Sequence, residues 1–377
     1  MSVLVIGGGI AGLSAAIALR QKGIDATVYE RADDVAAAQL GAGLGLAYNG
    51  TRVLRKLGLL DAVAEAGART KRFEFCTAEG ELLSEWSVRE GELQLGVARQ
   101  ALHKVLVDAA GDGTLVPGKT CVGFQDDGSS VTASFSDGTT ATGSLLLGAD
   151  GLRSIVRGQL HGEESPRYAG FSVLRSLVDV PEPEPPLPQG LFRLLWGKGL
   201  SFGQYYVAPG VVYIFGWQPE PEGEHIPRES RKQEFLARFR GSTAETQELI
   251  SRTTDESIHQ TDIYDRRPID PWGRGRVTLA GDAAHPMTFN MGQGACQGLE
   301  DAVVLAREIA REGETPAALR AYENERQKRA AGFVRNSARI ARMSLMRNPV
   351  ALRFRNSILK RSAKSLPRAE GKLMIDL

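Results

Sequence analysis

Glycines and one acid near the start of the sequence have the spacing of a dinucleotide-binding turn. The β-branched run 3–6 leads into Gly7-Gly8-Gly9-Ile10-Ala11-Gly12, a helical pattern follows, and the next strand ends at Glu30. Gly7 allows the tight turn, Gly9 lets backbone approach a pyrophosphate, and Gly12 lets the helix lie close to the sheet. The pyrophosphate would accept from free helix N–H groups, and Glu30 from ribose hydroxyls. Alone, this motif does not choose between FAD and NAD.

A second group of chemically suitable residues begins at Gly281-Asp282, directly after a buried strand predicted over 276–280. An aspartate at that point suits a hydrogen bond to a ribityl or ribose hydroxyl. Farther on, Gly292-Gln293-Gly294 opens a helix predicted over 294–311, so free N–H groups can face an electron-rich ring edge. In a flavin, the N1–C2=O edge gathers negative charge on reduction, and a helix N-terminus stabilises that form. This segment therefore favours a flavin.

The histidines and cysteines do not suggest a nucleophilic or metal site, and no metal is predicted. His285 lies inside the glycine–aspartate segment, where we expect it to hold the turn. Three further histidines have no partner at a meaningful spacing: His161, His225 and His259. The cysteines are widely spaced and form no C-x-x-C pair, which argues against a disulfide framework and fits a reducing compartment: Cys76, Cys121 and Cys296.

Length and composition are those of an ordinary globular protein. The 377 residues suffice for two domains, and 42% are hydrophobic and 24% charged. The net charge of +1 gives no argument for a nucleic-acid partner. No signal peptide is recognised, and no apolar window is long enough to span a membrane. We therefore expect a cytoplasmic protein that does not bind nucleic acid.

Segments typical of a nucleotide-binding α/β domain alternate along the chain with strand-rich aromatic segments. This alternation predicts a discontinuous nucleotide domain with an inserted sheet domain. Strand-like aromatic segments at 191–196, 202–207 and 211–217 have few crossover helices between them, which indicates an antiparallel sheet. Helical periods are expected at 51–60, 99–110, 230–239 and 294–311. The predicted units are 1–70, 97–164 and 262–345 for the nucleotide domain, 71–96 and 165–261 for the sheet domain, and 346–377 for a basic C-terminal helix and tail.

Three segments, taken in order, resemble the FAD-dependent aromatic hydroxylases, the single-component flavoprotein monooxygenases typified by para-hydroxybenzoate hydroxylase. The similarity covers about residues 1–345. Within the family, the sequence most resembles the smaller members, such as urate hydroxylase, salicylate hydroxylase and zeaxanthin epoxidase. It implies an α/β fold: a Rossmann-like, discontinuous FAD-binding domain with an inserted sheet-rich substrate domain and C-terminal helices. The segments are GGGIAG with Glu30; Leu147–Gly151 with Ser154 and Arg157; and Gly281–Pro286 with GQG and Glu300–Ala302.

The resemblance also implies which residues bind the cofactor. Arg99 matches the family arginine that contacts FAD, Asp150 lies in the segment that supports both FAD and NAD(P)H, and the backbone at Cys121 passes the adenine. The predicted cofactor-binding set is Gly7, Gly9, Ile10, Ala11, Gly12, Glu30, Arg31, Gly43, Leu44, Arg99, Cys121, Asp150, Gly281, Asp282, Gly292, Gln293, Gly294 and Ala295.

Three residues are predicted for the catalytic pocket. In relatives, the strand that carries Arg175 faces the cavity between flavin and substrate, and an aromatic residue stands near Tyr213. Phe289 stands where many members have proline, beside the reactive edge of the flavin. Leu200 stands where urate hydroxylases carry an arginine that contacts substrate, which argues against a purine.

The activity implied is that of the family. NADPH or NADH binds transiently and reduces FAD, O₂ adds to form a flavin C4a-hydroperoxide, and one oxygen atom passes to an aromatic or polyene-like small molecule. The sequence has no second G-x-G-x-x-G for a resident nicotinamide nucleotide. The alternatives are a flavin-dependent reductase and a redox-inactive FAD-binding accessory protein. The second is considered because Phe289 replaces the proline that many members have beside the reactive edge of the flavin. We expect a monomer or a homodimer.

The last part of the sequence is strongly basic. From Arg326 to Arg368 there are thirteen Lys or Arg residues and no acid, and Asn348-Pro349 marks a break between two helices. Val350, Phe354 and Ile358 recur every four residues. Such a helix can lie on an anionic membrane or pack on the acidic body of its own protein. Packing is the preferred interpretation.

Overall fold

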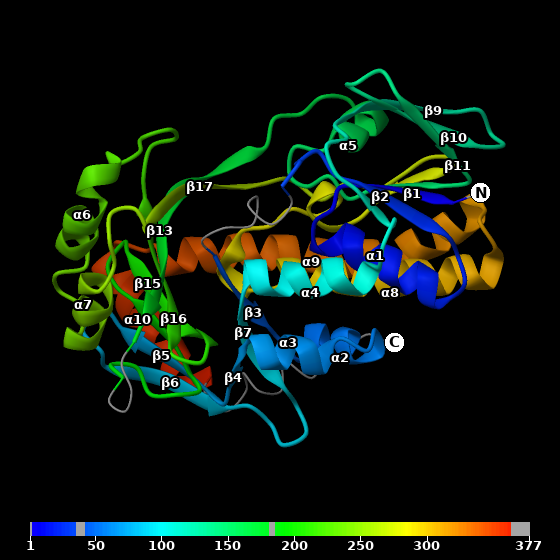
Figure 1. Ribbon diagram of the computed structural model, residues 1–377. Coiled ribbons are helices and arrows are strands. Elements are labelled where there is room, and N and C mark those ends of the chain that lie inside the picture. Colours follow the sequence, from blue (N-terminus) through cyan, green and yellow to red (C-terminus); the bar gives the residue numbers. More distant parts are fainter. Residues whose placement is uncertain (1, 35–41, 181–184, 363–377) are drawn as a thin grey trace.

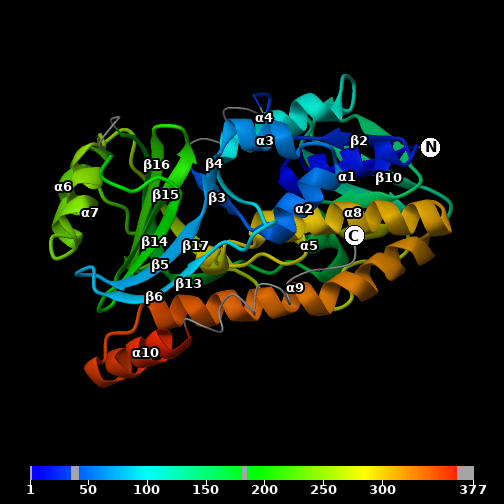
Figure 2. The ribbon, with the colours of Figure 1, turned by 90° about the horizontal axis from the view of Figure 1, so that it is seen from below.

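The molecule has two lobes joined along one long helix. The computed structural model describes residues 2–34, 42–180 and 185–362. Figure 1 shows the lobe with β1 and α1 at the right and the sheet-rich lobe at the left. Figure 2 shows α9 (Pro316–Ser344) running along the lower side of both lobes. At 1.5 Å per residue, α9 is about 43 Å long, enough to cross from one lobe to the other.

A parallel sheet organises the first lobe. Its strand order is β18 (Val277–Leu279), β12 (Leu146–Gly148), β1 (Val3–Ile6), β2 (Ala26–Tyr29) and β8 (Leu115–Val116), and each adjacent pair is parallel. The helices that pack around it are α1 (Ile10–Gln21), α4 (Arg99–Ala110) and α8 (Gly294–Glu312).

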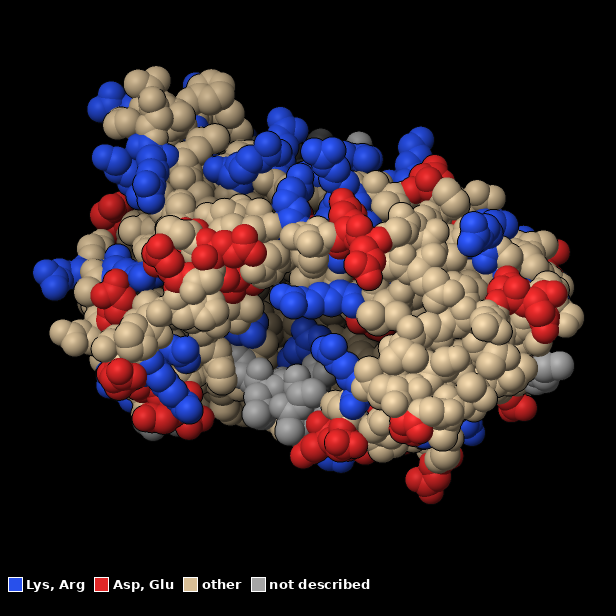
Figure 3. Space-filling view, turned by 90° about the horizontal axis from the view of Figure 1, so that it is seen from above, with Lys and Arg blue, Asp and Glu red and all other residues tan. Residues whose placement is uncertain are grey.

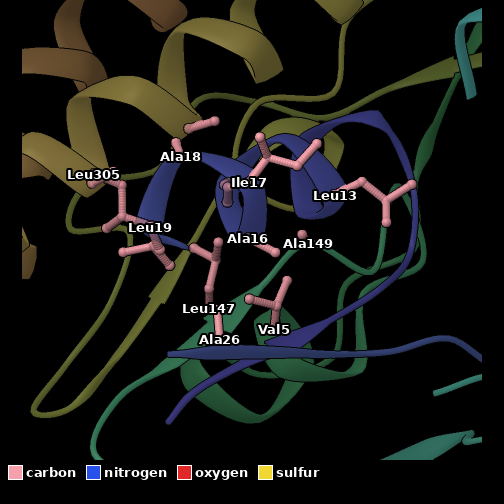
Figure 4. Close-up of a cluster of buried hydrophobic side chains, with 14 of the residues drawn as sticks. Val5, Leu13, Ala16, Ile17, Ala18, Leu19, Ala26, Leu147, Ala149 and Leu305 are labelled. Carbon is pink, nitrogen blue, oxygen red and sulfur yellow. The ribbon is translucent and has the colours of Figure 1, made fainter. Parts of the chain in front are cut away.

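The core of this lobe lies between the sheet and α1. All of β1 is buried, as expected for a central strand covered on both faces. Figure 4 shows Val5 and Leu147 of the sheet below Leu13 and Ala16 of α1, with Leu305 of α8 beside them. Small side chains on α1 allow it to approach both the sheet and α8.

A second sheet forms most of the other lobe. Its order is β17 (His259–Asp265), β13 (Arg167–Asp179), β16 (Val211–Pro219), β15 (Ser201–Ala208), β14 (Leu191–Trp196), β5 (Arg72–Thr77) and β6 (Leu82–Ser87). The antiparallel pairing predicted for the three aromatic segments is confirmed, because β14 pairs antiparallel to β15, and β15 to β16. On its other side, β14 runs parallel to β5. These two strands come from separate insertions in the chain. On the outer face pack α6 (Arg231–Arg238) and α7 (Ala244–Ser251) (Figure 1).

Smaller elements complete the fold. One antiparallel sheet has the order β3 (Gly43–Leu46), β7 (Gln94–Ala98) and β4 (Ala68–Thr70), and another β11 (Thr140–Gly143), β10 (Val131–Phe135) and β9 (Cys121–Asp126). The remaining short helices are α5 (Ile155–His161), η2 (Arg228–Ser230), η3 (Gly281–Ala283) and η4 (Phe289–Met291).

The prediction of a single helix over 51–60 is wrong. The chain forms α2 (Tyr48–Lys56) and α3 (Leu60–Ala66), with a turn between them. Gly58 adopts φ +73°, and the N–H groups of residues 58 and 59 donate to carbonyl groups at the end of α2. This left-handed helix end is one that glycine makes at little steric cost, so a glycine within the apolar period should have ended the predicted helix.

The C-terminal helix α10 (Pro349–Ser362) projects from the molecule at the end of α9 (Figure 2). It packs beside β6 through buried Arg355 and Leu359. Val350, Phe354 and Ile358, the apolar residues expected to pack on the body of the protein, instead face outward. Within the described residues, no helix is long and apolar enough to cross a membrane. The predicted domain boundaries stay a prediction.

Candidate active site

The chemically suitable residues gather at one edge of the parallel sheet. Because β18, β12, β1 and β2 are neighbours and parallel, their carboxyl ends meet at that edge. The turns that follow these strands carry Asp282, Asp150, Gly7 and Glu30 respectively. Ligands of open α/β sheets bind outside the carboxyl ends of the strands, so tertiary structure brings together segments almost 280 residues apart.

The three glycines of the first turn have different surroundings. Gly7 has φ +108°, and a Cβ there would lie 2.4 Å from the carbonyl oxygen of Ala149. A Cβ on Gly12 would lie 2.0 Å from the carbonyl oxygen of Gly7, so α1 could not approach as closely. Gly9, in contrast, has nothing within 4 Å of its Cβ direction. A ligand can therefore approach the backbone where α1 begins.

Two side chains hold this turn from outside. The Glu30 carboxylate accepts from the N–H of Gly8 at 2.7 Å and from that of Ala32 at 3.0 Å. Buried His103 of α4 makes a 2.7 Å hydrogen bond to the carbonyl oxygen of Gly8. Nothing in the sequence pattern singled out His103, because its partner is a backbone atom 95 residues away.

Asp150 faces α5. Its carboxylate accepts from the hydroxyl of Ser154 at 2.5 Å and from the N–H groups of Ile155 at 2.8 Å and Val156 at 3.2 Å. Burial raises the pKa of Asp150, and these hydrogen bonds oppose the shift. In this arrangement the side chain caps a helix N-terminus.

The second and third segments are joined by Arg157. Its buried guanidinium donates to the carbonyl oxygens of Ala283 at 3.1 Å and Ala284 at 3.2 Å. The turn that carries Asp282 is thereby fixed to α5.

The turn before α8 leaves its backbone accessible. Gly292 is left-handed with φ +62°, and α8 begins at Gly294 with Gln293 as its N-cap. A Cβ at either glycine would meet nothing within 4 Å. Asn49 of α2 donates to Gln293 at 3.0 Å and to Glu300 at 2.7 Å. The helix N-terminus is therefore fixed in place, and its backbone borders the open space of the cavity described below.

A buried charge network lies behind these turns. Asp301 of α8 accepts from the N–H of Gly281 at 2.9 Å, from His285 at 2.6 Å and from Arg326 of α9 at 2.8 Å. Arg326 also pairs with Glu300 at 2.5 Å, and both side chains are fully buried. Burial alone would raise the pKa of Asp301, but the charges of His285 and Arg326 outweigh it and lower the pKa to about 2. His285 thus contacts a structural acid.

A cavity of about 590 Å³ runs from the first glycine turn to the inner face of the second sheet. It is lined by these predicted residues: Gly9, Ile10, Ala11, Gly43, Leu44, Arg99, Tyr213, Gly281, Asp282, Phe289, Gly292, Gln293, Gly294 and Ala295. Other predicted residues lie outside its lining: Gly7, Gly12, Glu30, Arg31, Cys121, Asp150 and Arg175.

Arg99 and Asp282 place opposite charges at the cavity. Burial lowers the pKa of Arg99, while the negative charge of Asp282 opposes this shift and that of Arg175 adds to it. Asp282 is solvent-exposed within the cavity lining, unlike Asp150. A cation and an acceptor are thus available to polar parts of a ligand.

Aromatic rings form the far wall. They are Phe73, Phe75, Trp86, Phe192, Trp196, Tyr205, Tyr213, Phe215, Trp217 and Phe289. Phe289 meets Trp217 edge-on at 5.3 Å and Phe215 at 5.8 Å between ring centroids. The residue that replaces the family's proline is therefore part of this wall.

Tyr213 is held between a glycine and an arginine. A Cβ on Gly43 would lie 2.5 Å from Cγ of Tyr213, so the ring packs directly against the backbone of β3. Arg175 donates a hydrogen bond to the Tyr213 hydroxyl. Burial raises the pKa of Tyr213 to about 12, with Arg175 opposing the shift. Arg175 thus lies behind Tyr213 and outside the cavity lining.

Most wall residues were missed by sequence reasoning, although a signal exists. In β16, Tyr213, Phe215 and Trp217 alternate, and β14 and β5 carry aromatic residues with the same period of two. Alternate residues of a strand face the same side, so this pattern could have identified the wall. Leu200, used as an argument against a purine, packs instead beside the outer core.

The residues present fit FAD. The cavity lining includes the first residues of both α1 and α8, together with Asp282 and Arg99. Anionic groups are favoured at such N-termini. The apolar wall follows directly after the α8 turn, where a flat ring can lie against it.

Comparison with known families agrees with this geometry. A family model described as FAD binding domain matches residues 1–337, and the chain belongs to this family. The chain is 40% identical over 365 residues to the aurachin C monooxygenase/isomerase of Stigmatella aurantiaca, covering 96% of this chain and 94% of that protein. It is 33% identical to the FAD-dependent urate hydroxylase of Klebsiella pneumoniae subsp. pneumoniae, covering 89% and 88%.

Solved structures share the fold. The Klebsiella pneumoniae protein HpxO, complexed with FAD and uric acid, has a TM-score of 0.91 at 30% identity, covering 99% of this chain and 95% of that one. A salicylate hydroxylase substrate complex has a TM-score of 0.79 at 23% identity, covering 100% and 98%. The predicted family, fold class and FAD cofactor are confirmed.

Proposed function

We propose that this protein is an FAD-dependent monooxygenase that uses NADPH or NADH and O₂ to hydroxylate or epoxidise an apolar aromatic or unsaturated small molecule. One observation carries the proposal: a single cavity joins the flavin-binding turns to a wall of aromatic side chains. The alternatives of a reductase and a redox-inactive accessory protein are not favoured, because the relatives are named monooxygenases and hydroxylases.

Bound FAD supplies the electron transfer and the activation of oxygen. The N-terminus of α1 would hold the pyrophosphate, Glu30 and Asp282 would accept from sugar and ribityl hydroxyls, and Arg99 would add a positive charge. The N-terminus of α8 would stabilise negative charge that develops on the flavin ring on reduction. Phe289 and its aromatic neighbours exclude water from the substrate side.

The lining of the cavity defines the class of substrate. Its charged members, within the described residues, are Arg99 and Asp282, which belong to the cofactor end. Near Phe289, the Thr288 hydroxyl and the Asn290 amide line the cavity and lack hydrogen-bond partners in the described part of the chain. An apolar ring with one or two polar atoms fits these surroundings better than urate.

The compartment we propose is the cytoplasm. All three cysteines are free and buried: Cys76, Cys121 and Cys296. Unpaired cysteines favour a reducing environment.

The test is to follow NADPH and NADH oxidation by the FAD-loaded protein with apolar aromatic candidates and with urate, under ¹⁸O₂. The expected result is substrate-stimulated oxidation with one labelled oxygen atom in the product. Oxidation without label in any product would contradict a monooxygenase. A preference for urate would contradict the proposed apolar substrate class but would not contradict the monooxygenase reaction.

A further inference from the structure

The outer face of α10 is apolar and exposed. Val350 is 74% exposed, Phe354 69% and Ile358 42%. Half of the exposed large hydrophobic side chains in the described residues lie on this one helix. We call these three residues the α10 stripe. On an ideal helix they span about 80°, a continuous band along one side.

The opposite side of α10 is anchored, so the outward direction of the stripe is set by packing. Arg355 is buried, donates to the carbonyl oxygen of Trp196 at 3.1 Å and lies 5.5 Å from its ring centroid. Leu359 is buried in the core beside the same sheet. Rotating the helix to hide the stripe would bring Arg355 out of its site.

Basic residues surround the stripe. No acid occurs between residues 326 and 362. Figure 3 shows Lys and Arg side chains along the upper edge of the molecule, over α9 and α10. The exposed ones are Arg335, Arg339, Arg342, Arg347, Arg353, Lys360 and Arg361. An acid from another element, Glu81, pairs with Lys360 at 2.6 Å.

We propose that α10 is a membrane-docking surface, on which the protein lies against an anionic lipid bilayer with the α10 stripe in the boundary between headgroups and acyl chains. An exposed apolar band flanked by cations is the arrangement that binds this interface. The charge complementarity favours anionic lipid over a neutral apolar partner, because each nearby Lys or Arg adds attraction to an anionic surface.

The surface lies beside the cavity. Trp196 lines the cavity, and its ring and carbonyl oxygen hold Arg355 of α10. A lipophilic substrate that leaves the bilayer at α10 would therefore enter near the aromatic wall. This entry route rests on the proposed function, whereas the docking itself does not.

The test is co-sedimentation of the FAD-loaded full chain with vesicles, without substrate or NAD(P)H. The vesicles are phosphatidylcholine alone, or phosphatidylcholine with phosphatidylserine. A double variant, Phe354→Ser with Ile358→Ser, is compared with a matched control, Val122→Ser with Ile155→Ser. The control residues are exposed on β9 and α5 in the other lobe (Figure 1). FAD content and melting temperature establish that both variants fold.

We expect the wild-type protein to bind the anionic vesicles, more weakly at high salt because the charges are screened. The stripe variant should lose about tenfold or more in partitioning, and the control less than about twofold. Absence of wild-type binding, or an equal loss in the control, would overturn the proposal. A third outcome would also overturn it: the wild-type protein forms a dimer in lipid-free solution, the stripe variant does not, and neither binds vesicles. A second copy of the chain would then cover the stripe. Turnover assays remain interpretable in every case, because docking is measured without catalysis.

Discussion

Asp282 and Asp150 both follow strands of the parallel sheet, yet their carboxylates have different surroundings. Asp282 is exposed in the cavity, where its charge acts on Arg99. Asp150 accepts from the N-terminal N–H groups of α5. The two motifs look alike in sequence, and only the tertiary structure shows that the Asp282 carboxylate lines the cavity while the Asp150 carboxylate accepts from a helix N-terminus.

We predict that Asp282→Ala weakens FAD binding about tenfold or more, because a hydrogen bond to a charged acceptor is lost. Asp150→Ala should instead cost about 1 kcal/mol of stability through loss of the cap. Flavin fluorescence titration and urea unfolding measure the two effects. The exposed Asp112→Ala is the control for both. Unchanged FAD affinity in Asp282→Ala would refute its assigned role.

At the scale of elements, the contact of α8 with α9 decides how firmly the flavin turns are held. Arg326 of α9 reaches both Glu300 and Asp301 of α8 in a fully buried position. Asp301 in turn holds the N–H of Gly281, and Glu300 holds Asn49. Two turns of the cofactor site therefore depend on a helix that contributes few residues to the cavity itself.

Arg326→Met is expected to lower the free energy of unfolding by about 3 kcal/mol, because a buried cation shared by two carboxylates is removed. Glu300 keeps its pair with Arg329 and Asp301 its contact with His285. Arg252→Met, directly after α7, removes an exposed pair with Glu248 and should cost about 1 kcal/mol or less. Urea unfolding of both variants measures the difference. Equal losses of unfolding free energy in the two variants would show that the buried network stabilises the fold no more than a surface ion pair does.

The same network predicts acid sensitivity. The pKa of Asp301 is about 2 in the folded protein, below the ordinary value of 3.8 for an aspartate. Because the folded value is lower, the unfolded chain takes up the proton first as pH falls. The contribution to stability is therefore complete above about pH 5 and is lost progressively as the pH falls through about 2.

We expect the difference in unfolding free energy between wild type and Asp301→Asn to shrink between about pH 5 and pH 2. Using the difference removes the background of other carboxylates that titrate in the same range. A difference that stays constant with pH would mean that Asp301 is not charged in the folded state.

At the scale of the whole molecule, the cavity lies between the two lobes, with lining residues from the turns of the first lobe and from the strands of the second sheet. A ligand there contacts the turns of the first lobe and the inner face of the second. FAD is thus expected to stabilise the folded protein as a whole.

Removal of FAD should therefore lower the melting temperature, and added FAD should restore it in proportion to the logarithm of its concentration. At a hundred times the dissociation constant the gain is about 2.7 kcal/mol, on the order of five degrees for a chain of this size. Differential scanning calorimetry at several FAD concentrations measures this, with adenosine as a control that fills only part of the site. A melting temperature independent of FAD would contradict the placement of the cofactor between the lobes.

The sequence alone determined those features that rest on local constraints. The glycine turn and its helix, the α4 span from Arg99 to Ala110, and the start of α8 at Gly294 follow from positive φ angles, from Cβ contacts and from helical periods. Such constraints act within a few residues, so a motif identifies them. Together the three motifs were enough to identify the family and the cofactor.

Tertiary structure decided the rest, because it depends on which surfaces meet. The parallel pairing of β14 with β5 joins separate insertions, the Asp150 carboxylate faces α5, and the α10 stripe points outward because Arg355 occupies the inward site. The alternation of aromatic residues indicated which of them share a face, but not whether that face borders the core or a cavity. Side-chain direction and strand pairing are settled by contacts between distant segments, which no local pattern contains.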